Sequence, residues 1–342
     1  MASVATFGEV MLRLSPPGKN RLFQSPELRA FFGGAEANVA VALAGLGHQA
    51  RFLSVVPANE VGDAALRELL RFGVDVSFVV RQGRRLGIYF AESGAGQRAS
   101  QVIYDRAYSG LAEAGPGAVA WDEALAGMAW FHVSGITPAV SRSAADLTLE
   151  AVEAAKKKGL RVSVDLNYRG KLWTYGVSAP DVMQLIFAYA DVGLANEEDC
   201  QKALGIGGGL SLSPKPSKSD SYERLTLEVM DRFPNLECLA VTLRDSLNAD
   251  HTVWSAVLRN RKEFMTGPRY DIETVVDRIG TGDAFAAGLI HGFTTGRDGR
   301  DALAFAIAAS CLKHSIPGDF NIVSEAEVMA LMAGDRSGRI RR

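Results

Sequence analysis

The sequence predicts an α/β fold, with a doubly wound, mostly parallel sheet flanked by helices. From residue 130 onwards, short β-like runs alternate with apolar segments of helical length. An earlier glycine turn opens the same strand–helix–strand order. Such alternation is typical of parallel strands joined by helices, and ligands on these sheets bind at the carboxyl ends of the strands.

Composition excludes several functional classes. The chain has 342 residues, of which 47% are hydrophobic and 22% charged, and these are ordinary values for a globular protein. Its net charge of −2 gives no field that attracts nucleic acid or an anionic membrane. No apolar run reaches the ~18 residues of a membrane span, and three scattered cysteines indicate a reducing compartment. We therefore expect a cytoplasmic protein that binds neither nucleic acid nor membrane.

Runs rich in β-branched, leucine and aromatic residues mark the expected strands. They lie at 4–14, 51–56, 130–136, 161–167, 191–196 and 238–243. Hairpins are expected at 85–98 with 101–107 and at 253–258 with 263–273. Asn167, Asn196, Thr242 and Gly280 fall at strand ends, so we expect them to share one cleft.

Apolar or amphipathic segments, several of them ending in glycine or lysine, mark the expected helices. They lie at 37–46, 62–71, 142–158, 180–190, 301–314 and 324–333. The segment 207–220, GGGLSLSPKPSKSD, is rich in turn formers and predicts an exposed, mobile insertion.

The segment 274–292, TVVDRIGTGDAFAAGLIHG, carries the strongest functional signal. Residues 275–276 are expected to end a strand, and an apolar helix is expected to begin at Asp283. Gly280 and Gly282 allow close approach of a ligand to the backbone. The start of a helix favours anions, because its first N–H groups are unpaired and carry a partial positive charge.

A carboxylate at such a place repels phosphate, unless it takes a proton from the group that attacks the phosphate. We therefore interpret Gly280, Thr281 and Gly282 as an anion-binding loop and Asp283 as a general base. The alternative is that Asp283 is an ordinary N-cap, since Asp is a favoured N-cap residue.

Other polar residues are expected to converge on this loop. The set comprises Gly34, Asn38, Tyr89, Tyr104, Arg106, Asn167, Arg169 and Asp283. The guanidinium group of arginine forms two parallel hydrogen bonds with a carboxylate. Two arginines together with tyrosines and an amide therefore suit a small hydroxylated molecule that bears a carboxylate.

Several of these residues have a structural interpretation as well. Asn38 either satisfies a neighbouring loop carbonyl or points its amide at a substrate hydroxyl. Arg106 either pairs with Asp105 or binds substrate, and Arg169 either caps a loop or binds substrate. We favour the functional interpretation for both arginines.

Two segments resemble the signatures of the ribokinase-like (PfkB) carbohydrate kinase family: GGAEANVAVALAGLG at 33–47 and DRIGTGDAFAAG at 277–288. Further segments resemble the 2-keto-3-deoxygluconate kinases of that family: GEVMLRLSPPG, FFGGAEANVA, GIYFAES, VIYDRAYS, FHVSGITPA, DLNYRGKLW, VTLRDS and KHSIPGDFN. The resemblance implies a single ribokinase-like domain over residues 1–342, with a small β-sheet lid from parts of 10–35 and 83–107. It also implies a homo-oligomer that forms through the lid sheet.

The same resemblance implies ATP-dependent phosphorylation of 2-keto-3-deoxygluconate to 2-keto-3-deoxy-6-phosphogluconate. Asp283 would be the base, and Gly280, Thr281 and Gly282 would supply N–H groups to the developing charge. The implied substrate-binding residues are Gly34, Ala35, Glu36, Ala37, Asn38, Tyr89, Tyr104, Arg106, Arg169 and Asp319. The implied nucleotide contacts are Asn167, Asn196, Thr242 and Arg244, and Mg²⁺ would bridge the phosphates mostly through water.

Some features depart from the family pattern, and other functions stay open. The acid of the family's Asn-x-x-Glu element is Asp199 here, which is one carbon shorter, and Arg278 beside the loop is a candidate phosphate contact. One alternative is a kinase of the same family for a neutral sugar such as fructose or ribose. Another is a sugar-acid sensor without catalysis. A nucleotide-binding dehydrogenase is excluded, because GxGxxG is absent after the first strand.

Overall fold

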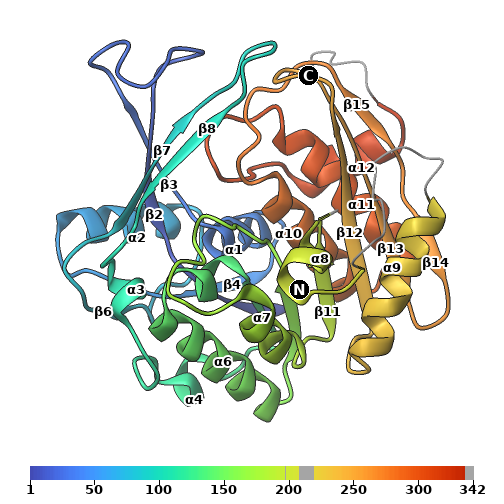
Figure 1. Cartoon of the computed structure of the whole chain (residues 1–342), viewed down its shortest axis with the longest axis horizontal. Helices are drawn as coiled ribbons and strands as arrows, with labels where there is room; N and C mark the ends of the chain where they lie inside the picture. The colour runs from blue at the N-terminus through green and yellow to red at the C-terminus, as the bar shows by residue number, and fades with distance from the viewer. Residues whose placement is uncertain (197, 208–218, 336–342) are drawn as a thin grey trace.

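The computed structural model, which describes residues 1–196, 198–207 and 219–335, has a large sheet between two layers of helices and a smaller sheet beside it (Figure 1). In spatial order the large sheet contains β14 (Phe264–Thr266), β13 (Thr252–Asn260), β12 (Cys238–Ser246), β11 (Val192–Ala195), β10 (Arg161–Asp165), β9 (Trp130–Ser134), β1 (Ser3–Phe7) and β4 (Gln49–Leu53). The strands from β12 to β4 run parallel, while β13 is antiparallel to β12, to β14 and to β15 (Tyr270–Ile272). Separately, β5 (Val55–Val56) pairs with β6 (Val80–Arg81).

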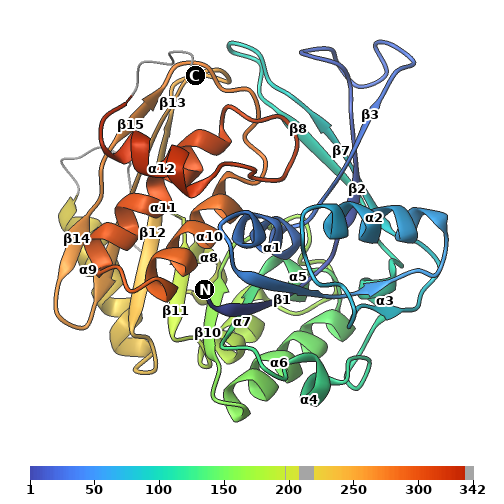
Figure 2. The same ribbon diagram turned by 180° about the vertical axis from the view of Figure 1, so that it is seen from behind.

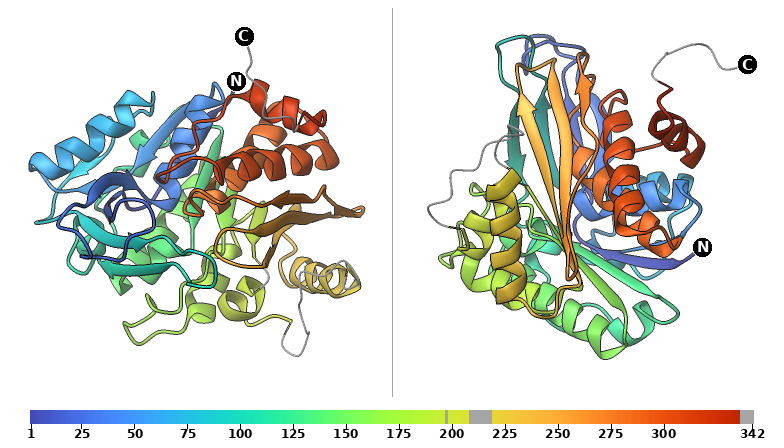
Figure 3. Two further views of the ribbon diagram at one scale, coloured as in Figure 1. Left: turned by 90° about the horizontal axis from the view of Figure 1, so that it is seen from above. Right: turned by 90° about the vertical axis from the view of Figure 1, so that its right-hand side faces the viewer.

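Helices cover both faces of the large sheet (Figure 3). One hydrophobic core joins the sheet to α1 (Ala35–Gly45), α2 (Glu60–Arg71), α10 (Thr281–Thr294), α11 (Gly299–Lys313) and α12 (Glu325–Met332). A second core joins the opposite face to α3 (Gly110–Glu113), α4 (Trp121–Ala124), α6 (Arg142–Lys157), α7 (Ala179–Phe187), α8 (Asp199–Leu204) and α9 (Ser219–Arg232), with α5 (Ile136–Ala139) packed against α6 and α7. Within the described residues, no helix has the length and apolar character that crossing a bilayer requires.

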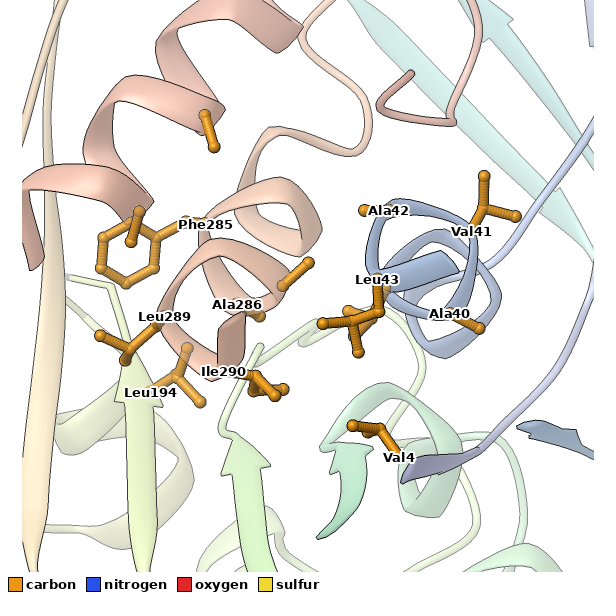
Figure 4. Close-up of a cluster of buried hydrophobic side chains, with 14 of the residues drawn as sticks. Val4, Ala40, Val41, Ala42, Leu43, Leu194, Phe285, Ala286, Leu289 and Ile290 are labelled. Carbon is orange, nitrogen blue, oxygen red and sulfur yellow. The ribbon is translucent and has the colours of Figure 1, made fainter. Parts of the chain in front are cut away.

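Close packing fixes the position of α10. Leu43 of α1 points toward α10 within one cluster of buried side chains (Figure 4). On the other side, a Cβ added at Gly288 would lie 2.8 Å from the Cα of Ala306, and one at Gly292 would lie 2.7 Å from the Cα of Ala302. The backbones of α10 and α11 therefore approach so closely that only glycine fits at these two positions. The first turn of α10 is held rigidly as a result.

The small sheet stands at the carboxyl end of β1, which leads directly into it (Figure 2). Its order is β3 (Arg29–Gly33), β2 (Met11–Ser15), β7 (Gly87–Glu92) and β8 (Gln101–Asp105), and its strands lie within 10–35 and 83–107. β2 is antiparallel to β3 and parallel to β7, and β7 is antiparallel to β8. One face of this sheet buries Met11, Arg13, Tyr89 and Ala91. The other face is more exposed.

The structure confirms the predicted doubly wound, mostly parallel sheet flanked by helices, with a separate small sheet. The single strand predicted over 4–14 is wrong, because β1 and β2 belong to different sheets. The chain leaves the large sheet at Gly8, where an added Cβ would lie 1.9 Å from Oε2 of the buried Glu36. The prediction that a strand ends at 275–276 is also wrong, because the strand that precedes the loop, β15, ends at Ile272.

One helix differs from the predictions, and one predicted segment lies mostly outside the described residues. The sequence analysis predicted no helix over Ser219–Arg232, although Tyr222, Leu225 and Val229 are buried at helical spacing. Charged residues between these positions interrupt the apolar pattern in the sequence, so the helix was not predicted. Of the predicted mobile insertion at 207–220, residues 208–218 lie outside the described residues.

Candidate active site

A cleft of about 620 Å³ lies where the carboxyl ends of the parallel strands face the small sheet and the start of α10. The structure brings most of the predicted site residues to its walls. These are Gly34, Ala35, Asn38, Tyr89, Tyr104, Asn167, Arg169, Asn196, Thr242, Arg244, Gly280, Thr281, Gly282, Asp283 and Asp319.

Gly280 makes the turn that leads into α10. Its φ of 83° lies in the left-handed region, and an added Cβ would lie 2.0 Å from the backbone oxygen of Asp319. Thr281 and Gly282 then form the first turn, where helical N–H groups have no partner within the helix. A Cβ at Gly282 would meet nothing within 4 Å, so a ligand can reach the backbone there. This geometry suits an anion.

Asp283 is the third residue of α10 and does not cap it. The N-cap is Gly280, which has no side chain, so the N-cap interpretation of Asp283 is wrong. Instead, Asp283 Oδ2 accepts a hydrogen bond of 2.6 Å from Nδ2 of Asn38. The amide oxygen of Asn38 accepts from the backbone N–H of Gly34 at 3.2 Å. The backbone N–H of Gly34, at the start of α1, therefore orients the side chain of Asn38, and Asn38 in turn holds the carboxylate of Asp283 in place.

The pKa of Asp283 is raised to about 7, chiefly because the carboxyl group is buried. The hydrogen bond from Asn38 lowers this pKa, the charges of Glu36 and Asp319 raise it, and Arg169 lowers it. A carboxylate whose pKa lies near neutrality accepts a proton far better than an ordinary one with a pKa near 4. The environment of Asp283 thus suits a general base.

Buried charges tie the small sheet to the loop before α10. Arg13 of β2 bridges two carboxylates, with Nη2 2.8 Å from Asp277 and Nη1 2.9 Å from Asp319. The hydroxyl of Tyr89 on β7 donates to Asp319, whose pKa is raised by burial. Asp277 also accepts from the backbone N–H of Ile279 at 3.0 Å, next to Gly280. Strands β2 and β7 of the small sheet therefore both contact the segments that support the loop.

The sequence analysis missed Arg13 and Asp277, although both line the cleft. The available signals were a single arginine inside an apolar strand and an acid three residues before Gly280. It also missed Asp165, at the end of β10. Burial, together with the charges of Asp199 and Asp283, raises the pKa of Asp165 well above its usual value. Such crowding of carboxyl groups is common at functional sites.

Asn167 and Asn196 lie just beyond the ends of β10 and β11, as predicted for strand-end residues. Asn167 has a φ of 33°, which asparagine tolerates better than most residues. Asp199 accepts from the backbone N–H of Asn196 at 2.9 Å and of Tyr168 at 3.0 Å, so it braces both loops. Thr242 donates to the carbonyl of Ala195 at 3.3 Å.

Glu36 and Ala37 do not line the cleft. The carboxylate of Glu36 is buried beneath it and accepts from the backbone N–H and hydroxyl of Ser134, both at 2.8 Å, and from the hydroxyl of Thr137 at 2.9 Å. Ala37 is fully buried in the core. Glu36 therefore acts on the site through its charge and through the strand end that it holds.

Arg106 does not line the cleft either. Its Nε lies 2.8 Å and its Nη2 2.5 Å from Oε2 of Glu9, and both side chains are buried. The pairing with Asp105 considered from the sequence is wrong too, since Asp105 pairs with Arg85 at 2.8 Å. Glu9 lies just after the first strand and is 97 positions away from Arg106 in the sequence. Local sequence patterns could therefore not reveal this pair.

Of the two arginines predicted to bind the substrate, Arg169 lines the cleft. Its side chain is exposed, and it donates to the carbonyl of its neighbour Tyr168 at 3.1 Å. Its charge lowers the pKa values of both Asp283 and Asp165, so it lies within electrostatic reach of each. It is suitably located to attract an anionic substrate.

The cleft also offers oxygen donors for a divalent cation. Among residues 1–196, 198–207 and 219–335, no group of three or more His, Cys, Asp and Glu side chains is arranged to hold a metal ion. Mg²⁺, however, keeps several waters and commonly binds through one or two carboxylates together with substrate phosphates. The neighbouring carboxyl groups of Asp165 and Asp199 fit that mode, because a cation would relieve their mutual repulsion.

Comparisons with known proteins agree with this geometry. Residues 1–225 and 246–323 match the family model described as pfkB family carbohydrate kinase. The structure is similar to the 2-dehydro-3-deoxygluconokinase of Thermotoga maritima, with a TM-score of 0.91 and 43% identity over 98% of this chain and 100% of that chain. The chain is 33% identical to the 2-dehydro-3-deoxygalactonokinase of Haloferax volcanii over 98% of each. It is 28% identical to the 2-dehydro-3-deoxygluconokinase of Bacillus subtilis over 95% of this chain and 93% of that protein.

The backbone of the loop can be tested by adding single methyl groups. Gly280→Ala should lower the free energy of unfolding by ~2–3 kcal/mol, because it combines a positive φ with an overlap on the backbone of Asp319. Gly282→Ala, a matched control with open space around its Cβ, should change it by less than ~1 kcal/mol. Urea unfolding measures both. Equal losses at the two glycines would contradict this description of the turn.

Proposed function

Because this chain belongs to the pfkB family of carbohydrate kinases, we propose that it transfers the γ-phosphoryl group of ATP to 2-keto-3-deoxygluconate, also called 2-dehydro-3-deoxygluconate. The product is 2-keto-3-deoxy-6-phosphogluconate. The observation that carries the proposal is the buried Asp283, with a pKa of about 7, in the first turn of α10 beside the open backbone of Gly282. The names of the Thermotoga and Bacillus relatives support the choice of substrate.

In this mechanism the terminal hydroxyl of the sugar acid points at Asp283. Asp283 takes the proton as the hydroxyl oxygen bonds to the γ-phosphorus, and the bond from that phosphorus to the bridging oxygen of ADP breaks. Asn38 holds the base in position through the 2.6 Å hydrogen bond. The N–H groups at Gly280, Thr281 and Gly282 would face the charge that develops on the transferring group, where fixed donors act most strongly.

The sugar acid would lie between the small sheet and the start of α1. Gly34, Ala35 and Asn38 form one side, and Tyr89 and Tyr104 cover it from the small sheet, which acts as the lid. Arg169 would bind the carboxylate of the substrate, since a guanidinium matches a carboxylate in two-point geometry. The buried charge of Asp319 is already shared with Arg13 and Tyr89, so its role would be to support the pocket.

The nucleotide would lie along the strand ends on the other side of Asp283. Asn167, Asn196, Thr242 and Arg244 line that part of the cleft and would contact ATP. Mg²⁺, held by Asp165, Asp199 and water, would neutralise the charge on the phosphates. Arg278 already donates to three oxygens of a neighbouring turn, so its part would be structural.

A second candidate substrate is 2-keto-3-deoxygalactonate, which differs from the first in the configuration of one carbon. The name of the Haloferax relative favours it. ADP release can be measured with each of the two acids and with ribose and fructose. The comparison distinguishes a kinase for sugar acids from a kinase for neutral sugars. Release of ADP also distinguishes a kinase from a sensor that only binds.

We also propose a homo-oligomer that forms through the outer face of the lid. Strand register puts Leu12, Leu14, Ile88, Phe90 and Ile103 on the face opposite to Tyr89. Ile103 is 52% exposed, and the ring of Phe23, itself 71% exposed, lies 6.0 Å from that of Phe90. An apolar sheet face of this kind fits the same face of a second copy.

A cytoplasmic location is part of the proposal. Cys200, Cys238 and Cys311 form no disulfide bond, as is usual for cysteines of proteins in reducing compartments. ATP is also the phosphoryl donor that such a compartment supplies.

Asp283→Asn should lower kcat by ~10²–10⁴ while the circular dichroism spectrum stays unchanged, because an amide cannot accept the proton. In the wild type, kcat/KM should fall about tenfold per pH unit below the pKa of about 7, since protonation of Asp283 removes the base. Initial rates by coupled ADP release across pH measure both. A variant with near-normal kcat, or a wild type that stays fully active well below neutrality, would exclude this role for Asp283.

Arg169→Gln should raise KM for the sugar acid about tenfold or more and change KM for ATP much less, because the carboxylate loses its cation. Arg142→Gln is the matched control, since Arg142 is also exposed and pairs with Asp146 on α6. Steady-state kinetics with each substrate varied in turn gives the answer. An equal rise in both KM values would argue against recognition of the carboxylate.

Ile103→Glu should dissociate the oligomer, because it buries a charge in an apolar interface. Leu185→Glu on α7 is the control, since Leu185 is 58% exposed but lies far from the lid in the fold. Size-exclusion chromatography with light scattering reports the mass. A wild type that is monomeric, or an Ile103→Glu variant that keeps its full mass, would count against the lid interface.

A further inference from the structure

Three turns meet at the mouth of the cleft, two from the lid and one from the large sheet. They are the turn after β2, which carries Lys19, the β7–β8 turn at 93–100 and the β12–β13 turn at 247–251. In Figures 1 and 2 the β7–β8 tip reaches toward the β12–β13 turn. Their backbones bond directly, because the N–H of Ala249 donates to the carbonyl of Gly96 at 2.8 Å. The lid therefore touches the large sheet at a point remote from the strands that connect them.

Asp250 is the centre of this junction. Its Oδ2 accepts from the backbone N–H of Gly96 at 2.7 Å, and its Oδ1 accepts from Nζ of Lys19 at 2.9 Å. Lys19 also donates to the carbonyl of Gly94 at 2.8 Å. A Cβ at Gly94 would lie 2.8 Å from that of Ala249, so the two turns are in close contact.

The β12–β13 turn is held from its other side independently of the lid. Arg278 donates from Nη2 to the carbonyls of Asn248, at 2.6 Å, and Ala249, at 3.1 Å. The backbone N–H of Val275 donates to the carbonyl of Asp250 at 2.9 Å. The turn is thus a fixed part of the nucleotide side of the cleft, and the lid is fastened to it.

The junction also borders the cleft itself. Lys19, Gly94, Gly96, Ala249 and Arg278 all line it. Opening the lid at this side requires that the bonds to Asp250 break. Nothing in the reaction described above uses Asp250, which lies outside the polar groups that face the transferring phosphoryl group.

We propose that Asp250 is a positioning residue that latches the β7–β8 tip to the β12–β13 turn and so keeps the lid closed over the bound sugar acid. The proposal rests on the sugar-acid kinase function above. If only the closed lid binds the sugar acid well, the apparent dissociation constant rises as the closed fraction falls. The latch is half exposed, with Lys19 45% and Asp250 39% accessible, so it is weak enough to open in each turnover.

The first test is kinetic. Asp250→Asn and Lys19→Met should each raise KM for the sugar acid about three- to tenfold, while kcat and KM for ATP stay within about twofold. The double variant should be no worse than the more affected single one, because both changes remove the same contact. High salt should raise the wild-type KM and affect the variants less, since a half-exposed ion pair is screened.

Asp271→Asn provides the matched control. Asp271, on β15, contacts the same β12–β13 turn through His251, at 2.5 Å, and among the described residues it has no hydrogen bond or ion pair to the lid. This control should behave as the wild type in every assay. If Asp250→Asn leaves all constants unchanged, raises both KM values equally, or lowers only kcat together with the melting temperature, the positioning role is overturned.

The second test does not depend on catalysis. Deuterium exchange of the peptide that covers 93–100 should be several-fold faster in Asp250→Asn than in the wild type, because the amide of Gly96 loses its acceptor charge. Unchanged exchange would overturn the latch. If the wild type phosphorylates no sugar acid while this exchange still responds to Asp250→Asn, the proposed function fails and the latch stands.

Discussion

The hydrogen bond from Asn38 to Asp283 joins the first turns of two helices from opposite ends of the chain, and the geometry of the cleft depends on it. Both helices begin at a glycine, Gly34 and Gly280, and neither has a side-chain cap. Their open N-termini therefore face the cleft. The close packing of α10 on α1 and α11 keeps the 2.6 Å contact in place, so the reactive carboxylate is rigid although it lies next to a glycine loop.

Charge balance beneath the loop explains why the environment of Asp283 is unusual. Arg13 pairs with both Asp277 and Asp319, and the buried Lys313, which donates to the carbonyls of Ile316 and Gly318, supplies a second positive charge near them. Buried charges are tolerated only when they are paired or well bonded. The hydrogen-bond partner of the Asp283 carboxylate is the neutral amide of Asn38, and burial raises the pKa of Asp283. Because Arg13 belongs to the small sheet, the same network connects the lid to the loop.

Local chemistry made some site residues predictable from the sequence. The run from Gly280 to Asp283 combines small residues with an acid at a helix start, and this combination is visible without the fold. The pairing of Arg106 with Glu9 could not be predicted, because the two residues are 97 positions apart, and the importance of Arg13 was missed because its partner Asp319 is also distant in the sequence. Helix α9 was overlooked, because its buried stripe of Tyr222, Leu225 and Val229 is interrupted by charges.

The sequence by itself determined most of the order of strands and helices, the glycine loop and the acid beside it, since periodicity and backbone freedom are local properties. It also indicated that strand ends such as Asn167 and Asn196 share a cleft, because parallel strands end at one edge. Only the tertiary structure decided which charges meet. Arg106 with Glu9, Arg13 with Asp319 and Asp250 with Lys19 are contacts between distant segments, and the free energy of a charged group depends on the neighbours that the folded chain brings to it.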